Sequence, residues 1–432
     1  MKQMTLIAIA AVFVAGFGWS PASAEQGRFL DVIVKLDVDT AGLPGEHGRA
    51  IAAEVASQHG VQARFTYGTV FSGFAARIPE ARLAQLEDDP MVAYIDFDAP
   101  VYAAGGNCPH CGGGDDDGGD DESNQTVPWG IERVGSQNNS NTGAGIAIYI
   151  IDTGIDANHR DLNVVGGFAV EECKGGGCSA AWDDDQGHGT HVAGSAAALD
   201  NDVDVVGVAP GADLYAVKVL NNRGSGSRSG VIAGVDWVTQ HAIQSGVATV
   251  ANMSLGGSGS KTGTCTSSGF SGDDTYHEAI CNSRNAGVVY VVAAGNSGAD
   301  ADGAVPAAYD DAVITVSATN ANDDWTSWSN WGNRSASWTS NDSAPVAIAA
   351  PGASILSTSA GGGTETMSGT SMAAPHVAGA AALVLASMPQ SNDGSAFENV
   401  RSILLNSAEG TGSFSNTSGN PHDEDFLDAS GL

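Results

Sequence analysis

Short apolar segments alternate with helical ones between residues 125 and 432, and this alternation limits the possible folds more than any other property of the sequence. We expect strands at 146–151, 214–220, 248–253, 288–293 and 312–317, and helices at 189–199, 229–244, 276–284 and 371–385. Short apolar strands separated by helices are typical of a parallel sheet buried on both faces. The pattern predicts an α/β domain with a mostly parallel, twisted sheet flanked by helices.

A smaller α+β domain is predicted over residues 25–103. Strands are expected at 32–34 and 91–97, a strand pair within 65–78, and helices at 50–58 and 81–86. Residues 104–124 then form a linker, because the run from Gly112 to Glu122 contains only Gly, Asp and Glu, whose carboxylates repel one another. Asp runs also bind calcium, so a cation site in this run stays open as an alternative.

The first 24 residues have the pattern of a secretory signal peptide. Lys2 is followed by an apolar run at 6–17 and by the small residues Ala22-Ser23-Ala24, which predict cleavage after Ala24. The run is shorter than the roughly 20 residues that span a bilayer, and we expect no later stretch to span one. The protein is therefore predicted to be secreted, with no membrane anchor.

Six cysteines fall into the close pairs Cys108/Cys111, Cys173/Cys178 and Cys265/Cys281. An even number in an exported chain favours disulfides. A metal site at Cys108 and Cys111 is the alternative, although the sequence contains no second pair of that spacing to complete it.

The charge of the chain excludes one class of partner. The sequence has 17 Lys and Arg against 50 Asp and Glu, a net charge of −33, so we expect no nucleic-acid partner. Because 42% of the residues are hydrophobic, the acidity does not imply disorder.

Three segments carry the residue types of nucleophilic catalysis. Asp152 ends an apolar strand, His188 begins the helical segment Gly187-His188-Gly189-Thr190-His191, and Ser371 lies where a Gly-containing turn enters a helix. Each has an ordinary explanation, because Asp and Ser cap helices and two histidines three residues apart can bind a metal. Together they supply an acid, a base and a nucleophile.

In the order Asp, His, Ser, these segments resemble the subtilisin and proteinase K family of serine peptidases, over nearly all of residues 125–432. Residues 25–103 resemble the family's inhibitory propeptide through Gly73-Phe74-Ala75-Ala76 and Val92-Ala93-Tyr94-Ile95. The resemblance implies a secreted, monomeric serine endopeptidase that acts on proteins or peptides. The resemblance further implies that the enzyme is made as a precursor and is bound by its own propeptide. We expect it to cut itself between about residues 102 and 125.

The resemblance also assigns a site. Asp152, His188 and Ser371 correspond to the catalytic triad, and Asn296 to the donor that stabilises the oxyanion. Substrate-binding positions are Gly224, Ser254, Leu255, Gly256, Ala293, Ala294 and Gly295, whose uncharged side chains favour an apolar or aromatic substrate residue. Asp183, Asp184 and Asp185 form either an acidic rim of this cleft or a solvated loop.

A structural calcium ion is implied at a second set of positions, which offer only oxygen ligands: Gln125, Asp161, Leu199, Asn201, Val203 and Val205. Two other classes of protein remain as alternatives, namely a noncatalytic binding protein on the same fold and an acidic calcium-binding protein.

Overall fold

The computed structural model describes residues 28–38, 44–104, 125–332, 345–410, 412 and 414–432. The predicted signal peptide, nearly all of the predicted linker, and the pair Cys108/Cys111 lie outside the described residues.

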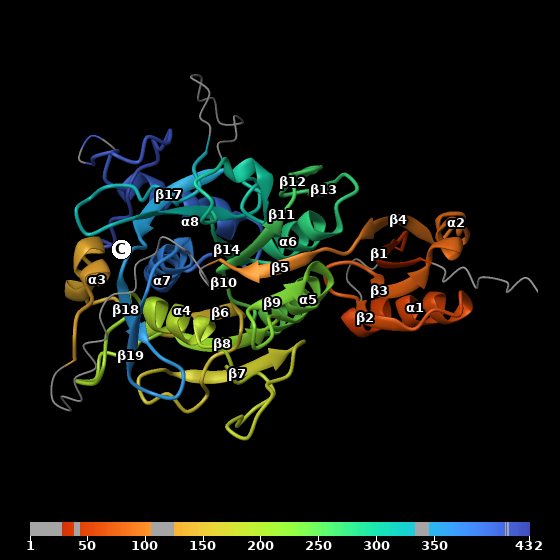
Figure 1. Cartoon of the computed structure of the whole chain (residues 1–432), viewed down its shortest axis with the longest axis horizontal. Helices are drawn as coiled ribbons and strands as arrows, with labels where there is room; N and C mark the ends of the chain where they lie inside the picture. The colour runs from red at the N-terminus through yellow and green to blue at the C-terminus, as the bar shows by residue number, and fades with distance from the viewer. Residues whose placement is uncertain (1–27, 39–43, 105–124, 333–344, 411, 413) are drawn as a thin grey trace, which may run out of the picture.

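A parallel sheet of seven strands forms the centre of the larger domain (Figure 1). Every neighbouring pair in it is parallel. Its order is β17 (Val346–Pro351), β16 (Ile314–Thr319), β14 (Val288–Ala293), β10 (Thr249–Met253), β6 (Ala147–Asp152), β8 (Asp213–Lys218) and β7 (Val164–Ala169). The predicted α/β class is confirmed.

Helices cover both faces of this sheet, as the alternation of side chains along β6 requires. Ile148 and Ile150 face the core that contains α4 (His188–Ala197) and α7 (Thr370–Ser387). Tyr149 and Ile151 face the opposite core, which contains α5 (Arg228–Ser245) and α6 (Thr275–Asn285). The structure also places α3 (Trp129–Val134) and α8 (Ser395–Ser407) in this domain.

Helix α7 corrects one expectation from the sequence. It is long and apolar enough to cross a membrane, although no such segment was expected after the signal peptide. In the structure 89% of its 18-residue apolar window is buried inside the protein, which is the environment of a core helix.

The smaller domain has one antiparallel sheet in the order β2 (Ala63–Tyr67), β3 (Gly73–Pro79), β1 (Phe29–Leu36) and β4 (Val92–Phe97). Two helices, α1 (Gly45–Gln58) and α2 (Leu83–Glu87), accompany it. The next strand, β5 (Pro100–Ala103), leaves this domain and joins the larger one, in the order β15 (Ala304–Val305), β11 (Leu255–Ser258), β5 and β9 (Ser225–Ser227).

Carboxylates of the smaller domain cap two helices of the larger one. Asp98 accepts hydrogen bonds from the N–H and hydroxyl of Ser229, in the first turn of α5. Asp96 accepts from the N–H and hydroxyl of Thr275, the first residue of α6, at 2.7 and 2.8 Å. Both carboxylates accept from N–H groups that have no partner within their helix, because helix N-termini present unpaired N–H groups.

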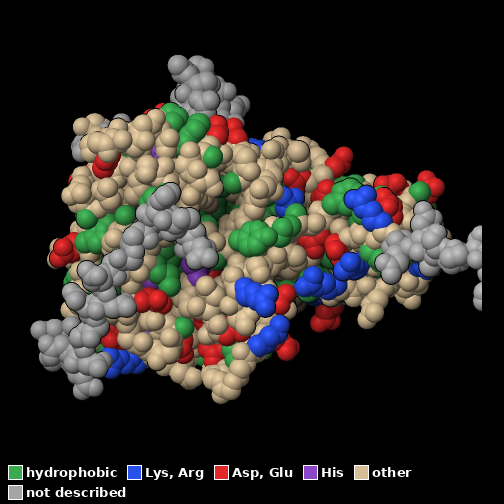
Figure 2. All heavy atoms as spheres, in the orientation of Figure 1, with side chains coloured by type: hydrophobic (Ala, Val, Ile, Leu, Met, Phe, Trp, Pro, Cys, Tyr) green, Lys and Arg blue, Asp and Glu red, His purple; other side chains and the backbone are tan. Residues whose placement is uncertain are grey.

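In other contacts at this boundary, the smaller domain supplies the cation and the larger domain the carboxylate. Figure 2 shows Lys and Arg side chains close to carboxylates there. Lys35 pairs with Glu278 at 2.7 Å, and Arg49 pairs with the buried Asp236 at 2.7 Å. The small domain therefore brings cations to the acidic surface of the larger one.

Two of the three predicted cysteine pairs are confirmed as disulfides. Cys173–Cys178 closes a short loop, and Cys265–Cys281 joins α6 to the hairpin of β12 (Thr264–Thr266) and β13 (Gly269–Ser271). A second hairpin, β18 (Ile355–Thr358) and β19 (Thr364–Met367), precedes α7.

Candidate active site

Asp152 and His188 meet at the carboxyl edge of the parallel sheet. Asp152 is the last residue of β6 and His188 the first of α4, and their side chains are 0% and 2% exposed. His188 Nδ1 lies 2.8 Å from Asp152 Oδ1, and His188 Nε2 is buried without a hydrogen-bond partner. Burial opposes a charged ring, but the carboxylates of Asp152, Asp184 and Glu365 together raise the pKa of His188.

Ser371 lies in the first turn of α7, close to the end of β5. Its hydroxyl donates to the carbonyl oxygen of Ala104 and lies 3.2 Å from the carbonyl oxygen of Ser254. The hydroxyl is thus directed toward the Ala104 carbonyl rather than toward His188 Nε2.

The backbone carbonyl of Ser371 is bound by a side chain instead of by its own helix. Pro375 has no N–H, so the Ser371 carbonyl lacks its usual helical donor. The Ser254 hydroxyl donates to that carbonyl at 2.8 Å, and Asn252 Nδ2 donates to the Ser254 hydroxyl at 2.9 Å. Ser254 therefore anchors the start of α7.

Asn296 holds the same Ala104 carbonyl from another side. Its Nδ2 donates to the Ala104 oxygen at 2.7 Å. Its Oδ1 accepts from both the N–H and the hydroxyl of Thr370 at 2.9 Å, which fixes the orientation of the amide.

Strand β5 lies in the cleft as a peptide substrate would. It pairs antiparallel with β9 on one side and with β11 on the other. Ala103 N donates to Gly224 O and Ala104 N to Ser254 O, both at 2.9 Å. Backbone pairing of this kind is how an extended peptide adds to a sheet edge.

A cavity of about 350 Å³ opens beside Ala104. Five of the predicted substrate-binding residues line it, and Ser254 and Gly224 bind the backbone of β5 instead. These five are Leu255, Gly256, Ala293, Ala294 and Gly295, and the structure adds Ala304 and the carboxylate residue Asp300 to the lining. The methyl group of Ala104 leaves most of this space unfilled.

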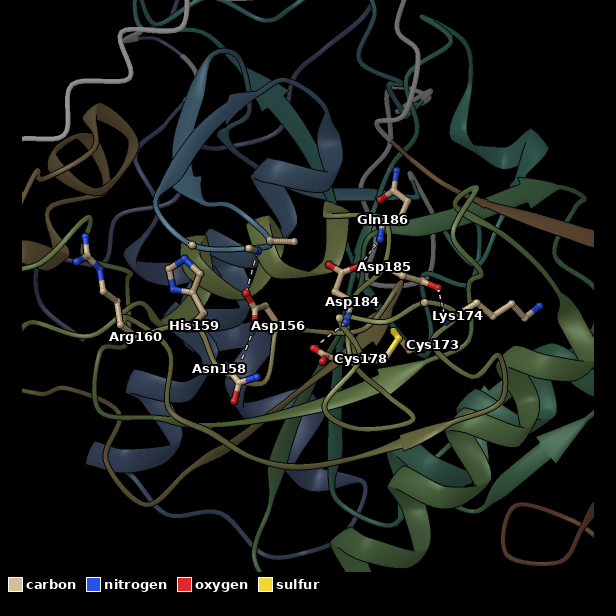
Figure 3. Close-up of a pocket in the computed structure, with 16 residues that line it drawn as sticks. Asp156, Asn158, His159, Arg160, Cys173, Lys174, Cys178, Asp184, Asp185 and Gln186 are labelled. Atoms are coloured by element: carbon tan, nitrogen blue, oxygen red, sulfur yellow. Dashed lines mark hydrogen bonds between the residues drawn. A yellow bond between two sulfur atoms is a disulfide. The ribbon is translucent and has the colours of Figure 1, made fainter.

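The three consecutive acidic residues before His188 line one cavity, with Asp183 buried and Asp184 and Asp185 partly exposed. Asp183 accepts from the N–H groups of Ala157 and Ser179, and Asp184 accepts from the N–H and hydroxyl of Thr190. Figure 3 shows Asp184 and Asp185 beside the Cys173–Cys178 disulfide, on the wall of a cavity of about 680 Å³. Their carboxylates are used to hold the loop.

The residues expected to bind calcium come together at the start of the larger domain. Carbonyl oxygens of Leu199, Val203 and Val205 converge on the side-chain amide of Gln125, at 2.5, 3.1 and 2.8 Å from Nε2. Asn201 Oδ1 accepts from Val203 N at 3.0 Å and lies 3.5 Å from the same amide.

Asp161 supplies the test of whether a cation fits. Its Oδ1 is buried without a partner, and burial raises the pKa of Asp161 to about 7. A buried, unpaired carboxylate oxygen beside several carbonyls fits a hard divalent cation such as calcium. Among the described residues, no group of three or more His, Cys, Asp or Glu side chains is arranged to hold a metal ion.

Sequence reasoning missed two residues that position Asn296. Thr370 holds its amide, and the buried Asn330 holds its loop by accepting from Ser297 N at 2.9 Å and donating to Ala294 O at 3.0 Å. Thr370 directly precedes Ser371, but no local pattern marks Asn330, which only the fold brings near.

Known proteins share both the sequence and the fold. Residues 143–426 match the sequence model of the subtilase family, and residues 32–104 match that of the peptidase inhibitor I9 family. Subtilisin DY of Bacillus licheniformis is 41% identical over 271 residues, which cover 61% of this chain and 86% of that protein.

Subtilisin-like protease 1 of Arthroderma otae is 35% identical over 338 residues, which cover 76% of this chain but only 59% of that protein. The crystal structure of a cold-adapted subtilisin-like serine proteinase has a TM-score of 0.56 and 35% identity, and covers 71% of this chain and 99% of that chain. The resemblance seen in the sequence is confirmed: the chain belongs to the subtilase family of serine peptidases, with an I9 inhibitor domain in front of the peptidase domain.

Proposed function

We propose that this subtilase is a secreted endopeptidase, made as an inactive precursor that cleaves its own chain after Ala104. The groups assigned to the reaction are the nucleophile Ser371, the base His188, its orienting carboxylate Asp152 and the oxyanion donor Asn296. The noncatalytic alternative is disfavoured because all four residue types are present at these positions.

The position of the Ala104 carbonyl carries this proposal. Asn296 Nδ2 and the Ser371 hydroxyl both contact its oxygen, and β5 is held between β9 and β11. A carbonyl held between a nucleophile and an oxyanion donor is the arrangement that acyl transfer requires.

The proposed reaction requires the Ser371 hydroxyl to turn from the Ala104 oxygen, which it contacts, toward the unpartnered His188 Nε2. Ser371 Oγ bonds to the Ala104 carbonyl carbon while His188 Nε2 removes the hydroxyl proton, and negative charge develops on the oxygen that Asn296 holds. His188 gives that proton to the departing amide nitrogen as the peptide bond breaks. Water hydrolyses the acyl-enzyme, which leaves a free carboxylate on Ala104.

Intact mass measurement of the purified precursor tests the assigned bond. Incubation should yield one fragment that ends at Ala104 and one that begins at Gly105 of the sequence. A first cut elsewhere, with Ala104 still joined to Gly105, would contradict the assignment.

Self-processing should be lost as pH falls through a value above about 6.5, the ordinary pKa of histidine. His188 must be neutral to accept a proton, and nearby carboxylates raise its pKa despite burial, so the inactive protonated form persists to higher pH. Single-turnover processing rates measured between about pH 5 and 9 check this. A rate independent of pH would exclude His188 as the base.

The unfilled cavity beside Ala104 predicts the substrate preference. Peptides with Phe before the cleaved bond should have kcat/KM at least about tenfold higher than matched peptides with Ala, because a larger apolar side chain fills the pocket. Initial rates on a matched pair of peptides measure this ratio. Equal rates would show that the cavity does not receive the substrate side chain.

Calcium should stabilise the enzyme without taking part in the reaction. The ion would be held by Asp161, Gln125 and the carbonyls of residues 199–205, and would supply the positive charge that the buried carboxylate lacks. A ligand that binds only the folded state, at a concentration of about 100 times its Kd, raises the free energy of unfolding by about 2.7 kcal/mol. This corresponds to a rise of roughly 5–10 °C in Tm.

Chelation is therefore expected to lower the Tm and speed self-digestion, while kcat of the surviving enzyme stays unchanged. Asp161→Ala should lower the Tm similarly and remove the response to added calcium. Asp200→Ala, which removes an exposed carboxylate of the same loop, should keep most of that response. Immediate loss of kcat at constant Tm would contradict a structural role.

A further inference from the structure

Lys218 is a buried cation at the carboxyl end of β8. Its side chain is 0% exposed, and among the described residues Arg284 is the only other Lys or Arg in the buried class. Burying an ammonium is costly unless its N–H donors find acceptors, so the partners of Lys218 are informative.

All three of its donors are used. Lys218 Nζ donates to Thr153 O at 2.5 Å, to Leu220 O at 3.0 Å and to Asp185 Oδ1 at 2.7 Å. Lys218 also lies directly opposite Asp152 in the pairing of β8 with β6.

Two of these acceptors belong to the segments that carry the Asp152–His188 pair. Thr153 follows Asp152, and its hydroxyl accepts from Gly189 N, directly after His188, at 2.8 Å. Asp185 lies three residues before His188, and its second oxygen accepts from Lys174 N at 2.9 Å (Figure 3).

We propose that Lys218 is a positioning residue for catalysis, which fixes the end of β6 relative to the loop that enters α4. It does so by binding Thr153 and Asp185 at once, and thereby sets the 2.8 Å hydrogen bond between Asp152 and His188. This inference rests on the proposed function of that pair.

The role predicts which kinetic constant changes. A misplacement of about 1 Å in a catalytic group costs on the order of 10²-fold in rate. Lys218 does not line the cavity beside Ala104, and β5 pairs with other strands, so substrate binding should be preserved. Loss of Lys218 should therefore lower kcat and leave KM unchanged.

Self-processing of the full-length precursor provides the test, because β5 is already seated and the rate reports chemistry alone. Lys218→Met should slow this single turnover about 10²-fold. In the processed enzyme kcat on a peptide should fall by a similar factor, with KM within about twofold. Arg284→Met is the matched control: it removes the other buried cation, which joins α6 to α8, and should process at the wild-type rate within about threefold.

Asp185→Asn tests the same contact with a milder change, and carries the test if Lys218→Met does not fold. It should slow processing about tenfold, and the double variant should be no slower than Lys218→Met alone, because both changes remove one interaction. Three results would overturn the proposal. The Lys218 and Asp185 variants could process at the wild-type rate, Arg284→Met could lose as much processing rate as Lys218→Met, or Lys218→Met could raise KM and leave kcat unchanged.

Ser371→Ala is measured alongside. Processing of the Ser371→Ala precursor would refute the proposed function. If Ser371→Ala is blocked while the Lys218 and Asp185 variants process at the wild-type rate, only the positioning role of Lys218 is refuted.

Discussion

The Ser371→Ala precursor is expected to accumulate uncut, with self-processing slowed by about 10⁶-fold, the loss typical of removing the nucleophile of such a triad. The Ser371 hydroxyl contacts the Ala104 carbonyl, whereas Asn296, the other side chain bonded to that oxygen, offers only an amide donor, which is not a nucleophile. Intact mass measurement over time, in a host without other proteases, gives the rate.

A control serine lies just before α7. Ser368→Ala removes a hydroxyl three residues earlier, which accepts from Ser354 N at 2.8 Å, and should process within about twofold of wild type. Circular dichroism shows whether each precursor is folded. Cleavage of the folded Ser371→Ala precursor at the wild-type rate would refute the nucleophile assignment.

Asn296→Ala should slow self-processing by about 10²–10³-fold, because one oxyanion donor is lost. Thr370 holds the Asn296 amide so that Nδ2 contacts the Ala104 oxygen, and this orientation costs nothing at the moment of reaction. For a peptide substrate the loss should lie in kcat rather than in KM, because the charge on the oxygen develops only in the transition state.

Asn296→Asp separates donation from packing. It retains an oxygen that can accept from Thr370 but places a negative oxygen near the Ala104 carbonyl, so it should be at least as slow as Asn296→Ala. An Asp variant faster than the Ala variant would show that Asn296 acts by supporting the loop and not by stabilising the oxyanion.

Five strands of the central sheet could be predicted because each contains a run of mainly apolar, buried residues, although β17 was missed despite the same pattern. The strand expected at 288–293 is β14, and Ser371–Leu385 lies within α7. Strand β7 was missed because Val164–Ala169 contains two glycines and is only partly buried, so it has no apolar run to detect. Strand β5 was missed because its partners, β9 and β11, follow it by more than 120 residues.

The site could be predicted less completely, for a related reason. Asp152, His188 and Ser371 lie in distinctive local sequences, whereas Lys218 and Asn330 act through contacts that only the folded chain creates. The acidic run at 183–185 lines a cavity, but its composition could not show that N–H groups of nearby turns also bind its carboxylates.

The most direct test of the whole account is covalent labelling of the processed enzyme during casein hydrolysis. A fluorophosphonate that modifies activated serines should abolish hydrolysis in proportion to labelling, with one adduct per chain that peptide mapping places on Ser371. Full hydrolysis by a completely labelled enzyme, or complete inhibition with the adduct on another residue, would contradict the assignment of Ser371 as the nucleophile.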